Sequence, residues 1–401
     1  MTAFIIDGLR TPIGSFGGSL ASVRPDDMAA LVMTRLLARH PSLDPARITD
    51  VIVGCANQAG EDNRNVARMS LLLAGLPISV PGITVNRLCA SGMSAVTMAA
   101  AGINAGDGDV YIAGGVESMT RAPYAMSKGA TPWARDAKIY DTSIGWRFVN
   151  DRMKELYGID SMGETAENVA DDYEVTRDDQ DRFAFGSQRK AAAARDSGRL
   201  ASEITPVMVP GPKKGSEVEF NADEFIRPDT TPEILSRLRP AFRGGGRGSV
   251  TAGNSSGIND GACALIVASE QGSRDLPVLA RVVANAAAGV EPRSMGMGPV
   301  PATQMALKKA GLTIDQIDVI ELNEAFASQS LACLRELGIP DDDPRVNRNG
   351  GAIALGHPLG MSGARLVLTA ARELDITGTR RALCTMCVGV GQGQAVIIER
   401  V

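Results

Sequence analysis

The sequence predicts an α/β fold made of two duplicated halves, with a long segment inserted into the first half. Short apolar runs alternate with helical patterns over residues 1–120, and the alternation returns over residues 271–401. Strands that alternate with helices are typical of βαβ units and indicate a largely parallel sheet. Residues 121–248 differ from both ends, because they hold both tryptophans and several turns rich in proline and glycine.

The elements of the first half follow from their apolar patterns. The expected strands are Phe4–Asp7, Asp50–Gly54, Ile83–Asn86 and Val110–Gly114. Residues 26–37 repeat apolar side chains every three or four positions, which predicts an amphipathic helix. In the inserted segment, helices are expected at Glu164–Tyr173 and at Arg177–Arg195, where Asp178 and Asp179 favour a helix N-terminus.

The amino-acid sequence of the second half repeats that of the first at several places. The matching stretches are Asp50–Ile52 with Asp318–Ile320, Val85–Arg87 with Val346–Arg348, and Asp109–Gly115 with Arg381–Gly389. Several matches in the same order favour duplication over coincidence. We therefore expect an N-terminal half at residues 1–120 plus 249–270, an inserted loop domain at 121–248, and a C-terminal half at 271–401.

Composition excludes several classes of protein. The 401 residues are 44% hydrophobic and 22% charged, as in an ordinary globular protein. A net charge of −5 argues against a nucleic-acid-binding protein, which would show a basic face. Six cysteines are too few for a disulfide scaffold. The first residues read as a strand and not as a signal peptide, and we expect no membrane-spanning helix and a cytoplasmic location.

Cys89 is the first candidate for chemistry. It follows an apolar run and precedes Ser91–Gly92, which opens an alanine-rich helix reaching about Asn104. Unpaired N–H groups and the helix dipole at such a junction are expected to lower the pKa of the thiol. The alternative is a buried structural cysteine, which is the commoner fate of a free thiol.

Only two histidines could serve a cysteine nucleophile as a base. His40 stands at a helix end beside Pro41 and reads as an exposed terminus. His357 lies in the glycine-rich run Gly350–Gly360, where the backbone can approach a ligand closely. Because imidazole titrates near neutrality, His357 is the expected base. The alternative is a core histidine in a tight turn.

Three further motifs contain residue types that can carry chemistry. Cys384 and Cys387 form a C-x-x-C, but residues i and i+3 of a strand point to opposite faces, so no metal or redox site is expected. Cys387 is better interpreted as a single thiol facing the site from a strand end, with Gly389 offering a backbone N–H. Asn323 could be no more than a helix N-cap. Residues 251–262 resemble a phosphate loop only loosely.

Together these motifs make the sequence resemble the thiolase family over residues 3–401. The stretches that carry the resemblance are Asn86–Gly92, Gly114–Met119, Asn323–Ala327, Gly350–Gly360 and Cys387–Gly393. The resemblance implies the thiolase fold: two duplicated α-β-α-β-α halves in five layers, with an inserted loop domain. It also implies an acyltransferase that uses coenzyme A as co-substrate, holds no permanent cofactor or metal, and forms a homotetramer.

Within the family, the sequence is most similar to the β-ketoadipyl-CoA (3-oxoadipyl-CoA) thiolases. The similar stretches are Cys55–Pro77, Thr142–Asn150, Gly158–Met162 and Leu383–Val388. Two positions depart from that subgroup: Ala90 stands where glycine is usual, and Gly163 where proline is usual. Ala90 is common in acetoacetyl-CoA thiolases. The expected reaction is cleavage of 3-oxoadipyl-CoA by CoA into succinyl-CoA and acetyl-CoA, and the alternative is an acetoacetyl-CoA or broad-range 3-ketoacyl-CoA thiolase.

The resemblance also assigns roles to residues. Cys89 carries the acyl group, His357 is the base, Cys387 the acid, and Asn323 holds a water beside the thioester oxygen. The backbone N–H groups of Cys89 and Gly389 form an oxyanion hole. Three further residues are implied to line the CoA tunnel: Arg227, Ser256 and Phe326. A ketoacyl synthase or a non-catalytic acyl-CoA-binding relative remain as alternatives.

Overall fold

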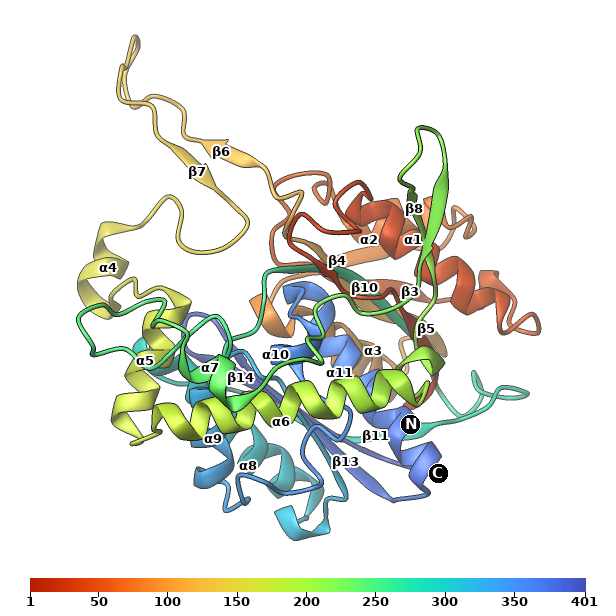
Figure 1. The fold of residues 1–401 in the computed structure, drawn as a ribbon. Coiled ribbons are helices and arrows are strands. Elements are labelled where there is room, and N and C mark those ends of the chain that lie inside the picture. Colours follow the sequence, from red (N-terminus) through yellow and green to blue (C-terminus); the bar gives the residue numbers. More distant parts are fainter.

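The computed structural model describes residues 1–401 and is layered, with helices and strands alternating from one side of the molecule to the other (Figure 1). The strands of the two halves join into one continuous ten-stranded sheet. Its path through the first half runs β4 (Gly82–Val85), β3 (Asp50–Gly54), β5 (Val110–Ser118), β10 (Asn259–Ala268) and β1 (Phe4–Arg10), with β2 (Gly14–Ser15) beside β10. The second half adds β11 (Ala280–Gly289), β14 (Gln392–Glu399), β13 (Arg381–Val388) and β12 (Val319–Leu322).

The duplication expected from the amino-acid sequence is visible in the strand order. In each half a central strand pairs in parallel on both sides: β3 with β4 and β5, and β12 with β13 and with Val346 through an isolated bridge to Ile320. Val346 therefore occupies the position of β4, as its sequence match to Val85 predicted. The two sets of strands meet where Phe4 and Ile5 of β1 pair with β11.

The expectation of a largely parallel sheet was wrong. The remaining pairs are antiparallel, including β1–β10, β10–β5, β11–β14 and β13–β14. Strands β13 and β14 are joined by Gly389–Gly391, and so short a turn can connect only antiparallel neighbours. The alternation of strands and helices in the sequence does not reveal such direct strand-to-strand connections.

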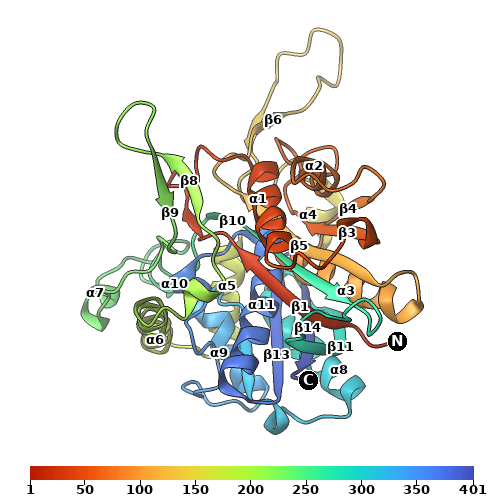
Figure 2. The same cartoon turned by 90° about the vertical axis from the view of Figure 1, so that its right-hand side faces the viewer.

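Three helical layers enclose the strands, and each has its own apolar core. The central layer holds α3 (Ser91–Ala105) and α11 (Leu359–Thr377), packed between the strands of the two halves. The outer layer of the first half holds α1 (Pro25–Ala38) and α2 (Val66–Leu73), and that of the second holds α8 (Pro299–Ala310) and α9 (Ala327–Glu336). The layers follow one another from α1 to α8 in Figure 2, which confirms the five-layer arrangement.

The inserted segment lies over one end of these layers. Its elements are β6 (Tyr124–Met126), β7 (Ile139–Asp141), α4 (Asp151–Tyr157), α5 (Met162–Asp172), α6 (Arg177–Asp196), β8 (Val207–Pro210), β9 (Glu217–Phe220) and α7 (Pro232–Ser236). Side-chain caps fix where the two predicted helices begin, since Ser161 accepts from the N–H of Glu164 and Thr176 from that of Asp179. The β6–β7 arm projects away from the body of the molecule (Figure 1).

Two local expectations need correction. The first is that no helix could span a membrane. Residues 88–105 are uncharged, and their length and composition would allow them to cross one. In this structure 67% of the segment is buried inside the fold, as in a core helix.

The second concerns His40, which was expected to be exposed. It is only 7% exposed, and its Nε2 lies 2.9 Å from Oδ2 of Asp7. The carboxylate of Asp7 also binds Arg39 and Arg372, so it draws this helix end onto β1.

Candidate active site

The site begins where the N-terminal ends of α3 and α11 meet, and glycines allow them to meet closely. A Cβ added to Gly92 of α3 would lie 2.5 Å from the carbonyl oxygen of Gly360 in α11. A Cβ added to Gly115 of β5 would also collide with that oxygen. Only backbone fits between these segments. The packing brings the turn that carries Cys89 next to the loop that carries His357.

Cys89 sits in a single 3₁₀ turn, Leu88–Ala90, immediately before α3. Ser91 fixes this turn, because its Oγ accepts from the N–H of Arg87 and donates to the carbonyl of Leu88. Burial raises the pKa of the Cys89 thiol to about 11, although backbone N–H groups of Gly389 and of Cys89 itself oppose the rise. The expected lowering of this pKa was therefore wrong, because desolvation of the thiolate outweighs the N–H groups.

His357 is held at three points. Its backbone N–H donates to Oδ1 of Asn259, its Nδ1 lies 2.6 Å from Oγ of Ser362, and its Nε2 lies 3.3 Å from Nδ2 of Asn323. The hydroxyl hydrogen of Ser362 is donated to the carbonyl of Pro358, so Nδ1 must carry the imidazole proton. Nε2 is then unprotonated: it accepts from Nδ2 of Asn323 and can act as the base. Burial, with a contribution from Arg365, lowers the pKa of His357 to about 3, and the ring is neutral.

Asn323 follows β12 and is completely buried. It is not a helix cap, because α9 begins four residues later at Ala327, after Phe326. Its amide nitrogen faces His357, and its buried Oδ1 has no hydrogen-bond partner. An uncommitted acceptor beside an imidazole is suited to hold a water or a polar part of a substrate.

Cys387 and Cys384 lie on opposite faces of β13, as expected. Cys384 and Met386 pack into the central core, whereas Cys387 packs with Phe326, Met295 and neighbouring residues. Burial raises the pKa of Cys387 well above its usual value, and nearby Cys89 adds to the rise. Cys387 is therefore a protonated thiol. The end of its strand reaches the turn that holds Cys89, because a Cβ added to Gly389 would lie 3.0 Å from Cδ1 of Leu88.

Of the residues expected to bind CoA, Arg227 lies on the inserted segment, and Ser256 and Phe326 lie on adjoining loops of the two halves. The N–H of Ser256 donates to the carbonyl of Ala325, and the ring of Phe326 meets Phe242 edge to face. Arg227 is exposed and stacks over the ring of Phe225, 5.4 Å from its centre. Phe225 in turn covers Gly257, beside Ser256. Phe326 thus packs in one cluster with Cys387, Ser256 is bonded to the residue before Phe326, and Arg227 is exposed to solvent.

Three residues that support the site were not singled out from the sequence. Asn259 and Ser362 hold His357, and the carboxylate of Glu117 accepts from the N–H groups of Ala56, Asn57 and Gly360. Neither asparagine, serine nor glutamate is unusual at these positions, so only the contacts of the three residues distinguish them.

One group of metal-ligand type is present: Cys55, Asp62 and Glu117, all buried. The oxygens of Glu117 are engaged by its three backbone donors, and burial raises the pKa of the Cys55 thiol well above its usual value. The group therefore fits a hydrogen-bonded thiol better than a thiolate ligand.

Comparison with known proteins identifies the family. Residues 3–271 match the model for the thiolase N-terminal domain, and residues 276–400 match that for the C-terminal domain. The chain is 61% identical over 401 residues to the 3-oxoadipyl-CoA/3-oxo-5,6-dehydrosuberyl-CoA thiolase of Escherichia coli K12, covering 100% of this chain and 99% of that one. It is 60% identical over 400 residues to the β-ketoadipyl-CoA thiolase of Pseudomonas aeruginosa, covering 99% of each.

A solved structure agrees with this result. Human mitochondrial 3-ketoacyl-CoA thiolase superposes with a TM-score of 0.92 at 37% identity, covering 100% of this chain and 99% of that one. The paired thiols, the neutral imidazole and the repeated strand order all occur in the matched regions. The chain therefore belongs to the thiolase family of acyltransferases.

Proposed function

We propose that this enzyme cleaves 3-oxoadipyl-CoA with CoA, giving succinyl-CoA and acetyl-CoA through an acyl group on Cys89. One observation carries the site assignment: the turn that holds Cys89 packs against both other motifs. A Cβ added to Gly92 would lie 2.5 Å from the carbonyl oxygen of Gly360, near His357, and one added to Gly389 would lie 3.0 Å from Cδ1 of Leu88. The substrate is taken from relatives about 60% identical over the whole chain, which are named for 3-oxoadipyl-CoA.

The first half of the reaction forms the acyl-enzyme. Nε2 of His357 accepts the proton of Cys89 as the sulfur attacks the 3-keto carbon. The N–H groups of Cys89 and Gly389 stabilise the resulting oxyanion. When it collapses, the bond between C2 and C3 breaks and the acetyl-CoA enolate leaves. Cys387 then protonates C2, while His357 and a water held by Asn323 stabilise the thioester oxygen.

The second half transfers the acyl group to CoA. The CoA thiol gives its proton to the Cys387 thiolate left by the first half, attacks the Cys89 thioester and releases succinyl-CoA. The Cys89 thiolate then takes back the proton held by His357, which restores the resting enzyme. Arg227, Ser256 and Phe326 line the CoA path in this proposal. Coenzyme A is a co-substrate, and no bound cofactor or metal takes part.

Mass spectrometry tests the intermediate, and kinetics test the substrate. Cys89→Ala should abolish thiolysis and the succinylated peptide that wild type forms with succinyl-CoA. We expect kcat/KM to be higher for 3-oxoadipyl-CoA than for acetoacetyl-CoA or a long 3-ketoacyl-CoA. Retained thiolysis in Cys89→Ala would overturn the mechanism, and a clear preference for acetoacetyl-CoA would overturn the substrate.

Thiolysis of acetoacetyl-CoA is the second candidate function, and one residue favours it. Ala90 follows the nucleophile, as is common in acetoacetyl-CoA thiolases, and it is completely buried against the core. Exchange of Ala90 for glycine should therefore leave the ratio of the two kcat/KM values unchanged if 3-oxoadipyl-CoA is the substrate.

The remaining features of the proposal concern organisation. We propose that residues 1–120 with 249–270 and residues 271–401 form the catalytic halves, and that residues 121–248 supply contacts to CoA. We also propose a cytoplasmic homotetramer. Cell fractionation would test the cytoplasmic location, and light scattering would test the tetramer.

A further inference from the structure

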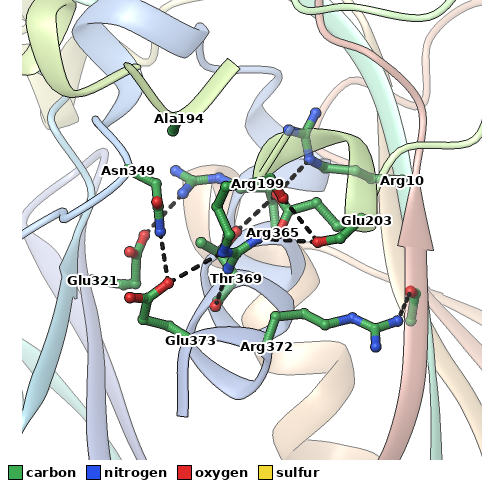
Figure 3. A network of polar contacts seen from close by, with 12 residues as sticks. Arg10, Ala194, Arg199, Glu203, Glu321, Asn349, Arg365, Thr369, Arg372 and Glu373 are labelled. Atoms are coloured by element: carbon green, nitrogen blue, oxygen red, sulfur yellow. Dashed lines mark hydrogen bonds and ion pairs between the residues drawn. The ribbon is translucent and has the colours of Figure 1, made fainter. Parts of the chain in front are cut away.

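A buried ion pair lies behind the two residues proposed to bind the thioester oxygen. Nη1 of Arg365 is 3.0 Å from Oε2 of Glu321, and the two side chains are 1% and 0% exposed. The pair belongs to a larger buried network that includes Arg10, Arg199, Glu203 and Glu373 (Figure 3). No step of the proposed reaction uses it.

The ion pair and the catalytic contact cross-link the same two elements. Glu321 on β12 stands two residues before Asn323, so both side chains face the central layer. The packing agrees, because Val319 lies in the central core and Ile320 and Leu322 lie in the outer one.

On α11, Arg365 stands almost one turn after Ser362, whose Oγ lies 2.6 Å from Nδ1 of His357. Contacts therefore form a closed ring: Asn323 to His357, His357 to Ser362, along α11 to Arg365, across to Glu321, and back along β12 to Asn323.

The two ends of the catalytic contact are not equally secured. His357 is held by Ser362 and by Asn259, independently of Asn323. The side chain of Asn323 has no partner other than His357, and its Oδ1 has none. Its backbone N–H donates to Thr385 of β13. The position of the Asn323 amide is therefore set by how β12 lies against α11, which is where Arg365 binds Glu321.

Stability alone is a poor reason for such a pair. Desolvation of two buried charges roughly offsets their attraction. Oε1 of Glu321 and Nη2 of Arg365 are also buried without partners. A well-packed apolar pair would hold the layers together equally well, but it would not fix the spacing of β12 and α11 at one atomic contact.

We propose that the Arg365–Glu321 ion pair is a positioning element, which holds Asn323 in place against His357 and so controls the carbon–carbon cleavage step. This inference rests on the proposed function, in which Asn323 and His357 stabilise the enolate oxygen. Acyl transfer between Cys89 and CoA uses the other oxyanion hole, formed by the N–H groups of Cys89 and Gly389. The two half-reactions should therefore depend differently on the pair.

The test compares these half-reactions in the full-length double variant Arg365→Met/Glu321→Met, which removes both charges and keeps the volume. Exchange of labelled CoA into succinyl-CoA reports acyl transfer alone. Thiolysis of the 3-ketoacyl-CoA reports cleavage as well. We expect kcat for thiolysis to fall at least about tenfold, with exchange and the KM for CoA changed less than about threefold. Arg365→Lys, which keeps a cation, should recover part of the loss.

Controls separate the possible failures. Arg199→Met/Glu373→Met removes another ion pair of the same network, which contacts α11 but not β12, and should lower both half-reactions equally or neither. Asn323→Ala tests the proposed function: if it leaves thiolysis unchanged, the role of Asn323 is wrong. If Asn323→Ala impairs thiolysis while the double variant does not, or if the double variant lowers both half-reactions by one factor, the positioning role is overturned.

Discussion

At the scale of single residues, the two reacting groups of the site, the thiol of Cys89 and the imidazole of His357, are both neutral in the resting protein. The pKa of Cys89 is raised to about 11 and that of His357 is lowered to about 3, and burial is the main cause of both shifts. A preformed thiolate–imidazolium pair is therefore not the resting state. Proton transfer has to accompany attack on the substrate, when the N–H groups of Cys89 and Gly389 meet the developing oxyanion.

Alkylation of Cys89 tests this resting state. Because a raised thiol pKa leaves little thiolate at neutral pH, we expect the rate with iodoacetamide to rise about tenfold per pH unit from pH 7 to pH 10. Peptide mass spectrometry assigns the label, and Cys89→Ala is the control. A rate that reaches a plateau below pH 8 would show a thiolate stabilised by His357 and contradict the structure.

Ser362 should determine which nitrogen of His357 is the base. Its hydroxyl donates to Pro358 and accepts from Nδ1, which leaves Nε2 as the unprotonated nitrogen. We expect Ser362→Ala to lower kcat/KM by roughly tenfold or more with little change in melting temperature. Ser330→Ala removes a similar buried bond, to the carbonyl of Phe326, away from the imidazole, and is the matched control. Equal losses in both variants would argue against a tautomer role.

At the scale of elements, close approach of helix ends places the site. Gly92→Ala would push a methyl group against the carbonyl of Gly360, so we expect a loss of about 1–3 kcal/mol in unfolding free energy and a larger proportional loss of activity. Gly186 of α6 has open space around it, and Gly186→Ala should stabilise the protein by up to about 1 kcal/mol. Chemical denaturation measures both; a neutral Gly92→Ala would contradict this packing.

The sequence predicted the bounds of helices and strands better than it predicted the contacts between them. Strand β3 was placed at its observed bounds, and α1 and α6 to within a residue at each end, because periodicity and caps are local signals. The antiparallel pairs depend on contacts between distant segments. So do the burial of His40 by Asp7 and the raised pKa of Cys89. Motif positions could not show that Asn259 and Ser362 hold His357, since neither residue type is unusual there.

At the scale of the whole molecule, the β6–β7 arm is the part least explained by a single chain. It projects from the layers in Figure 1 and carries exposed apolar side chains. Trp133 is 95% exposed, and Tyr124, Met126 and Ile139 are exposed by more than half. Such a concentration of apolar surface on a projecting arm is typical of a protein–protein contact. It supports the proposed homotetramer, because an arm of this kind can reach a neighbouring subunit.

Replacement of the arm's apolar residues tests the assembly. We expect Trp133→Ser/Ile139→Ser to lower the mass measured by light scattering from a tetramer to a smaller species, because the contact loses two of its exposed apolar side chains. Thiolysis per chain should fall less than about threefold, since no catalytic candidate lies on the arm. Met208→Ser, which removes an exposed side chain from strand β8, should leave the mass unchanged. If the double variant keeps the wild-type mass, the arm does not hold the subunits together.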